Sequence, residues 1–200
     1  MSRIRRASLG LAIALILAPT PALAQADWLV TPFAGVKFGG ATSIVDLELA
    51  AGRTTMTWGV SAAVLTRGIF GAEAEFAYVP GYFEKGEQNL VTASYAFDFT
   101  GNLILTLPPG ATGGGLRPYA VIGAGVIHAE AADILNIFRI RRSVPAINLG
   151  VGAIGFVTNN AGVRFDVRYL RSVATDDEAA LSVGRRISYW RGTVGVVLKL

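Results

Sequence analysis

The stretch Val163-Arg-Phe-Asp-Val-Arg-Tyr169 alternates apolar and charged side chains at every position. Such a period of two is that of an extended strand whose two faces meet different surroundings, because successive side chains point to opposite sides. A helix would instead repeat its apolar positions every three or four residues. The stretch therefore predicts a β-strand with one apolar face and one ionic face.

The same period recurs on both sides of this stretch and predicts seven more strands. Compact turns follow the second, fourth and sixth strands, and longer connections at 39–54, 80–89, 129–145 and 172–186 follow the others. Alternating short turns and long loops are typical of outer-membrane barrels, and an even strand count places both termini in the periplasm. The expected strands are 28–38, 55–65, 69–79, 90–105, 116–128, 146–156, 163–169 and 187–200.

The composition points to a membrane, although no helix suits one. The chain of 200 residues is 52% hydrophobic. Beyond the N-terminus no segment offers 18 clean apolar residues, and the nearest, 119–138, contains His128, Glu130 and Asp133. A closed barrel is the other structure that satisfies its backbone in lipid. We therefore expect an all-β fold, an eight-stranded antiparallel up-and-down transmembrane β-barrel.

The first 24 residues are typical of a secretory signal peptide. Three arginines precede a short apolar run, and Ala22-Leu-Ala24 fits the small-x-small cleavage pattern. An uncleaved anchor helix is the alternative, which the shortness of the run disfavours. We expect a signal peptide at 1–24 and a barrel at 25–200. Removing three of the 18 bases leaves 15 against 14 acids, so the mature chain has no basic excess that would indicate a nucleic-acid partner.

Cysteine is absent from the sequence. This excludes a disulfide scaffold, a thiolate metal site and an N-terminal lipid anchor. We expect no cofactor and no metal. A soluble, lipocalin-like barrel remains an alternative at this point, because the period of two does not say which face lies inside. High hydropathy, the lack of disulfides and the C-terminal strand favour the membrane.

The ionic faces of the strands predict a charged interior. Eight strands enclose a space that side chains can just fill, and an unpaired charge there would cost several kcal/mol. We therefore expect the charges to pair in a network that closes the lumen as a structural plug; a gated or narrow ion path is the alternative. The network is expected to contain Lys37, Glu73, Glu75, Asp98, Arg117, Arg164, Asp166, Arg168 and Arg191.

Two further groups are expected near the external rim. Outward aromatic side chains there would form an interfacial girdle, and arginines in or beside the third and fourth long loops could pair with lipopolysaccharide phosphates. The expected girdle is Phe38, Trp58, Tyr78, Tyr169 and Trp190, and the expected phosphate contacts are Arg139, Arg141, Arg142, Arg171, Arg185 and Arg186.

Several segments in order resemble the small outer-membrane β-barrel family of OmpA-like and OmpX-like, or porin-family, domains. They are Trp28-Leu-Val-Thr-Pro-Phe-Ala-Gly35, Glu73-Ala-Glu-Phe-Ala-Tyr-Val-Pro-Gly-Tyr-Phe83, Leu116-Arg-Pro-Tyr-Ala-Val-Ile-Gly-Ala-Gly125, Asn148-Leu-Gly-Val-Gly152 and Gly162-Val-Arg-Phe-Asp-Val-Arg-Tyr169. The resemblance covers nearly all of the mature chain. It implies residence in the outer membrane of a Gram-negative bacterium, but a shared scaffold does not specify an activity.

The resemblance also suggests partners. They are outer-membrane lipids, lipopolysaccharide and the barrel-assembly machinery, with the barrel itself a monomer. Members usually end in an aromatic residue that this machinery reads, whereas this chain ends in Leu200. Lipid A deacylases on eight-stranded barrels use Ser with His near the outer rim, but His128 has no Ser two positions on. We therefore expect a structural or surface-interaction barrel rather than an enzyme, with no catalytic residue.

Overall fold

The computed structural model describes residues 26–42, 54–66, 68–80, 91–107, 112, 115–133, 139–173 and 187–200. The expected signal peptide and most of the expected long loops lie outside these residues. Among the described residues, no helix is long and apolar enough to cross a membrane.

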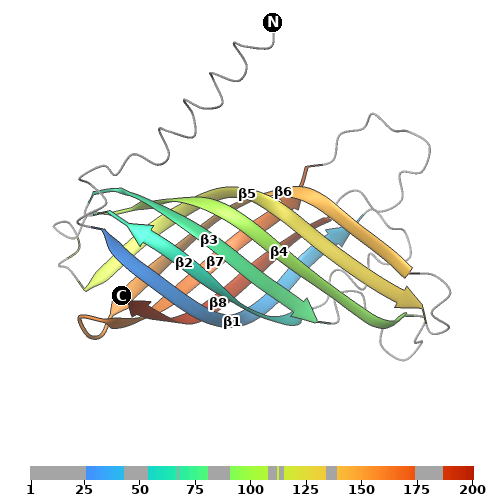
Figure 1. The fold of residues 1–200 in the computed structure, drawn as a ribbon, viewed down its shortest axis with the longest axis horizontal. Coiled ribbons are helices and arrows are strands. Elements are labelled where there is room, and N and C mark those ends of the chain that lie inside the picture. Colours follow the sequence, from blue (N-terminus) through green and yellow to red (C-terminus); the bar gives the residue numbers. More distant parts are fainter. Residues whose placement is uncertain are drawn as a thin grey trace, which may run out of the picture.

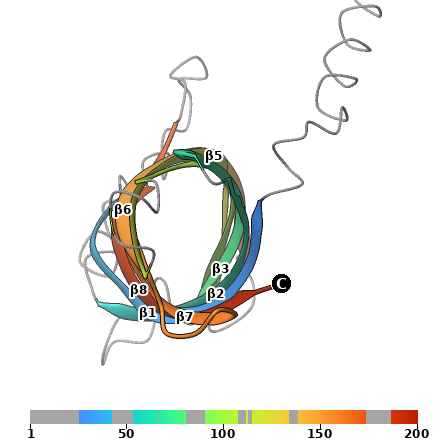
Figure 2. The ribbon, with the colours of Figure 1, turned by 90° about the vertical axis from the view of Figure 1, so that its left-hand side faces the viewer.

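Eight antiparallel strands close into one barrel in sequence order, each paired with the next, and β8 paired with β1 (Figures 1 and 2). This confirms the expected all-β, up-and-down architecture. The strands are β1 (Asp27–Thr42), β2 (Thr55–Leu65), β3 (Phe70–Pro80), β4 (Val91–Thr106), β5 (Leu116–Asp133), β6 (Arg139–Phe156), β7 (Ala161–Ser172) and β8 (Ile187–Lys199).

The third connection is shorter than the sequence predicts. Residues 129–145 were expected to form a loop, but β5 runs on to Asp133 and β6 already begins at Arg139. The extra residues of β6 pair with β5, as in Ala129↔Arg142 and Ala132↔Arg139, and those of β5 also pair with β4. Such a hairpin gets its hydrogen bonds from its own two strands, so it continues past the point where β7 ends. The mixed composition of this segment hides the period of two.

The first strand also exceeds its expected end, because a bulge carries it past Phe38. The β1–β8 register shifts between Phe38 and Ala41. Gly39 adopts a positive φ of 59° there, a conformation that side chains other than glycine rarely take. The bulge lets β1 continue to Thr42.

Two ends of the barrel can be distinguished by their connections. The turn end holds the start of β1, the end of β8 and the short connections that follow β2, β4 and β6. The loop end holds the other four connections. On β1, Trp28 and Phe38 mark the two limits of an outward apolar row, ten residues apart. At about 3.3 Å per residue and a tilt of about 40°, this row is roughly 25 Å tall, which matches the apolar band of outer-membrane barrels.

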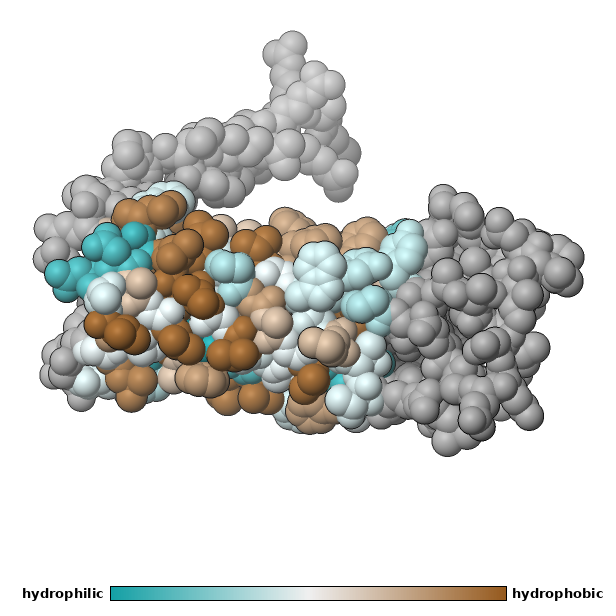
Figure 3. Space-filling view, turned by 90° about the horizontal axis from the view of Figure 1, so that it is seen from below, coloured by the Kyte–Doolittle hydropathy of each residue, from teal (hydrophilic) through white to brown (hydrophobic). Residues whose placement is uncertain are grey.

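The two faces of the wall differ as a membrane barrel requires. On β7, Phe165 is 61% exposed whereas the neighbouring Asp166 is 4% exposed. Figure 3 shows apolar side chains over much of the described outer surface. A lipocalin-like barrel would have the opposite arrangement, with apolar side chains inside and charged side chains exposed to water. The structure therefore excludes the soluble alternative.

Candidate functional site: the filled lumen

A layer of charged side chains lies across the middle of the lumen. Among the described residues, four acids and four bases are buried here on inward faces. In a closed ring of eight, strands four apart in sequence order lie opposite each other, so β3 faces β7 and β4 faces β8. Most of the acids are on β3 and β4, and most of the bases are on β7 and β8. The layer consists of Lys37, Glu73, Glu75, Asp98, Arg164, Asp166, Arg168 and Arg191.

Arg168 is the hub of this layer. Its guanidinium contacts Glu73 at 2.7 Å and Glu75 at 3.3 Å across the lumen, and Asp166 at 2.7 Å on its own strand. The side chain is fully buried. Three carboxylates therefore share one cation, and charge-assisted bonds of this kind are the stronger class of hydrogen bond.

Two more arginines complete the cross-lumen pairs. Arg164 binds Glu73 at 2.5 Å and Asp166 at 3.3 Å. Arg191 binds Asp98 at 3.0 Å and also pairs with Glu75. Lys37 is fully buried beside them, opposite Arg191 in the β1–β8 ladder. The paired charges offset a desolvation cost that would otherwise oppose folding.

Neutral side chains that the sequence analysis did not single out extend the network. Tyr119 donates to Asp166 and accepts from Arg164 Nε at 2.6 Å, while Tyr189 donates to Asp98 at 3.0 Å. Asn102 donates to Glu73 at 2.9 Å. The alternation of 116–128 places Tyr119 on the same face as Arg117, and that is the signal that could have found it.

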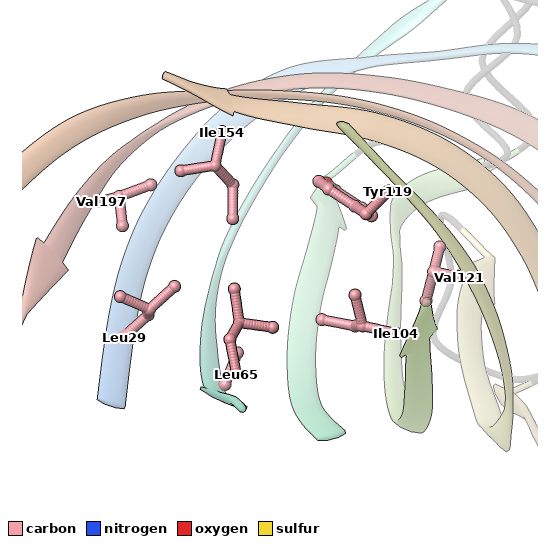
Figure 4. Packing of buried hydrophobic residues seen from close by; sticks show 8 residues of the cluster. Leu29, Leu65, Ile104, Tyr119, Val121, Ile154 and Val197 are labelled. Atoms are coloured by element: carbon pink, nitrogen blue, oxygen red, sulfur yellow. The ribbon is translucent and has the colours of Figure 1, made fainter. Parts of the chain in front are cut away.

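Apolar layers cover the network on both sides. Along β4, Ala96 precedes Asp98, Thr100 and Asn102, and Ile104 follows them. The loop-end layer consists of Val79, Ala96, Ile127, Ala129, Ala146, Leu170 and Tyr189. The turn-end layer, which lies on β1, β2, β4, β5, β6 and β8, consists of Leu29, Ala63, Leu65, Ile104, Tyr119, Val121, Ile154 and Val197 (Figure 4). Both layers separate the charges from water at the ends.

Contrary to the expectation from the sequence, Arg117 does not belong to the central network. It is buried at the turn end, where Nη1 contacts Asp27 at 3.1 Å and Nη2 donates to the Thr66 carbonyl at 3.0 Å. Asp27 also binds Lys199 at 2.7 Å. The reason is its place at the start of β5, where the turn-end apolar layer lies between it and the central charges. This cluster links the first, fifth and last strands.

Two inward glycines on β6 leave space for the large side chains of the network. A Cβ added at Gly150 would lie 2.7 Å from Arg168 Cγ, and one at Gly152 would collide with the Tyr119 hydroxyl. β6 therefore has no side chain at the two positions over which Arg168 and Tyr119 lie. Because glycine is neither polar nor apolar in side chain, these inward positions also weaken the period of two in the sequence of β6.

The expected girdle residues lie on the outward face towards the loop end. Tyr169 and Trp190 are in ring contact at 5.1 Å, and Trp58 and Tyr78 at 5.2 Å. Phe38 is opposite Trp190 in the β1–β8 ladder. The structure adds Tyr95, whose ring is 6.0 Å from that of Tyr78. Aromatic rings at this level suit a membrane–water interface.

The arginines expected to contact phosphate are only partly described. Arg171 is exposed on β7, two residues beyond Tyr169 on the same face. The backbones of Arg139, Arg141 and Arg142 belong to β6 rather than to a loop. Arg185 and Arg186 lie outside the described residues.

His128 has a partner that sequence separation concealed. Its Nδ1 is 2.7 Å from Ser143 Oγ, and the two residues are opposite each other on β5 and β6. The imidazole also stacks on Phe97 at 4.8 Å. The longer hairpin brings Ser143 to this position, where the expected loop would not have fixed it.

A narrow antiparallel barrel with an apolar belt and an internally paired lumen defines the class of small transmembrane β-barrels. The sequence matches the family model of the outer membrane protein β-barrel domain over residues 10–186, and the chain belongs to this family. Its place is accordingly the outer membrane. No curated protein matches the chain.

Two solved structures show the same fold. Neisserial surface protein A has a TM-score of 0.61 at 11% identity, with 88% of this chain and 99% of that chain covered. The outer membrane protein OprG from Pseudomonas aeruginosa has a TM-score of 0.58 at 16% identity, with 87% and 95% covered. At such identities the likeness concerns the fold and not the activity.

Proposed function

We propose that this protein is a structural and surface-interaction barrel of the outer membrane whose lumen is closed to solutes. The observation that supports this proposal is the layer of mutually paired, buried charges between two apolar layers. An open aqueous path would leave such side chains in contact with water. A barrel filled in this way contributes rigidity and a platform for its loops, and it acts as a monomer.

The orientation is part of the proposal. Small outer-membrane barrels have short periplasmic turns and longer external loops. On that pattern the turn end, with both termini, faces the periplasm. The aromatic residues near the loop end then lie at the outer interface, close to the lipopolysaccharide headgroups.

Conductance separates the closed barrel from the alternative, a narrow porin-like ion channel. The purified protein in planar bilayers is expected to give no stable single-channel steps, because Arg168 and its partners occupy the middle of the lumen. The control is to show that the same preparation is folded, by its resistance to heat in detergent, so that the absence of steps is not due to unfolded protein. Reproducible steps of one size would overturn the closed lumen.

The surface role includes recognition of lipopolysaccharide phosphate at the loop end. Arg171 supports it, because it is exposed just beyond Tyr169 on the outward face and a guanidinium can bind phosphate with two bonds. Adding lipopolysaccharide should raise the unfolding temperature, and Arg171→Gln should reduce that rise by about half. Lys199→Gln removes the same charge at the turn end and should leave the rise intact. Equal effects of both variants would contradict the assignment.

We propose no enzymatic role for the pair of His128 and Ser143. A serine nucleophile also needs donors for the oxyanion that forms. Among the side chains that the structure describes, the outward ones beside the pair, Phe97 and Val126, are apolar and offer none. The polar pair suits the outer interface, where Ser and His can hydrogen-bond to each other or to lipid headgroups.

A further inference from the structure

The amides beside Glu73 have only one consistent orientation. A carboxylate accepts hydrogen bonds, so Asn102 must present its NH2 group to Glu73, and it does so at 2.9 Å. The carbonyl oxygen of Asn102 therefore faces Asn148, whose NH2 group donates to it at 2.7 Å. In this chain of hydrogen bonds, Asn148 thus uses its NH2 group as a donor, and its carbonyl oxygen, Oδ1, remains as an acceptor without a protein partner in the described part of the molecule.

A free donor lies at the other end of the same chain. Arg168 Nη2 donates to Glu73 Oε1, the oxygen that also accepts from Asn102. Arg168 Nε donates to Asp166. Among the described residues, Arg168 Nη1 and Asn148 Oδ1 are both buried without a protein partner. Buried polar atoms of this kind are usually satisfied by ordered water.

The local backbone brings these two ends towards each other. Gly150 is opposite Arg168 in the β6–β7 ladder, and Asn148 lies two residues from Gly150, so both face inward. The Arg168 side chain lies over Gly150, where a Cβ would be 2.7 Å from Arg168 Cγ. No side chain of residue 150 therefore separates the arginine from the asparagine.

We propose that the lumen binds one structural water between Arg168 Nη1 and Asn148 Oδ1. The water accepts a hydrogen bond from the guanidinium and donates one to the amide oxygen, which closes a ring with Glu73 and Asn102. Water is the ligand of choice because Arg168 Nη1 can only donate and Asn148 Oδ1 can only accept, whereas a small anion or cation would satisfy only one of these atoms. The proposal rests on the closed lumen in one respect: a water held between two apolar layers exchanges slowly.

A crystal structure at about 1.8 Å resolution tests the site directly, since ordered buried waters appear as discrete peaks. We expect a peak within hydrogen-bond distance of both atoms, at about 2.7–3.2 Å. Asn148→Leu should abolish the peak, and Asn159→Leu, in the exposed turn after β6, should keep it. Direct contact between Arg168 Nη1 and Asn148 Oδ1, or a site empty of density, would overturn the proposal.

Solution NMR of the unaltered protein in micelles keeps the test independent of the folding of Asn148→Leu. Cross-relaxation between water and the Asn148 side-chain amide should have the sign of a water that stays for longer than nanoseconds. A fast-exchanging signal together with channel conductance would show an open lumen and reject the proposed function. A direct Arg168–Asn148 contact in a barrel that does not conduct would reject the water alone.

Discussion

Replacing Arg168 with methionine is expected to destabilise the barrel by about 3–5 kcal/mol, the usual cost of removing one partner from a buried ion pair. Methionine has a similar length and leaves no large cavity, so the loss reports on charge. Glu73, Glu75 and Asp166 would all lose a cation that now contacts them. The free energy of unfolding in urea, measured by tryptophan fluorescence in lipid vesicles, should fall accordingly.

Two further variants isolate this effect. Arg171→Met changes the same residue type on the same strand at an exposed position, and its unfolding free energy should stay within about 0.5 kcal/mol of the parent value. Adding Glu75→Gln to Arg168→Met restores the balance of charges and should recover part of the loss. If Arg168→Met proves as mild as Arg171→Met, the network does not stabilise the barrel.

The general position of these charges can be read from the sequence. The period of two in 163–169 and 69–79 assigns Arg164, Arg168 and Glu73 to the non-apolar face. An eight-strand ring then places the third strand opposite the seventh. These two facts place the charges of the third strand across the lumen from those of the seventh. The pattern does not give the depth of a residue along the barrel axis, so it groups Arg117 with the central charges although Arg117 lies at the turn end.

The remaining differences have a common physical origin. Period and turn residues mark a strand where two faces meet unlike surroundings. Past the end of β7, β6 has a neighbouring strand on one side only among the residues that the structure describes, and the sequence of 139–145 carries little alternation although the ladder with β5 persists. The contact between His128 and Ser143 depends on this extension. The role of Tyr119 is hidden for another reason. The sequence does not show whether a buried tyrosine hydroxyl has a carboxylate beside it, as that of Tyr119 has in Asp166.

Gly152→Val is expected to have the second large effect, a loss of about 3 kcal/mol or a failure to fold, because overpacking a filled interior forces its neighbours to move. The new Cβ would lie 2.5 Å from the Phe165 carbonyl oxygen and would collide with the Tyr119 hydroxyl. Tyr119 would then leave Arg164 and Asp166, which it now bridges. The heat-resistant folded form in detergent gels should disappear at a lower temperature than in the parent protein.

The matched control is the same substitution on the other face of the wall. Gly101 is exposed on β4, and a Cβ added there meets nothing within 4 Å. Gly101→Val should therefore be neutral or slightly stabilising, since a β-branched side chain favours an extended backbone and adds apolar surface towards lipid. Glycine itself weakens a strand, so intrinsic propensity alone predicts a gain at both positions. If Gly101→Val gains stability and Gly152→Val loses much of it, the filled lumen accounts for the difference. If both variants gain stability, the space around Tyr119 is not filled and the packing argument is wrong.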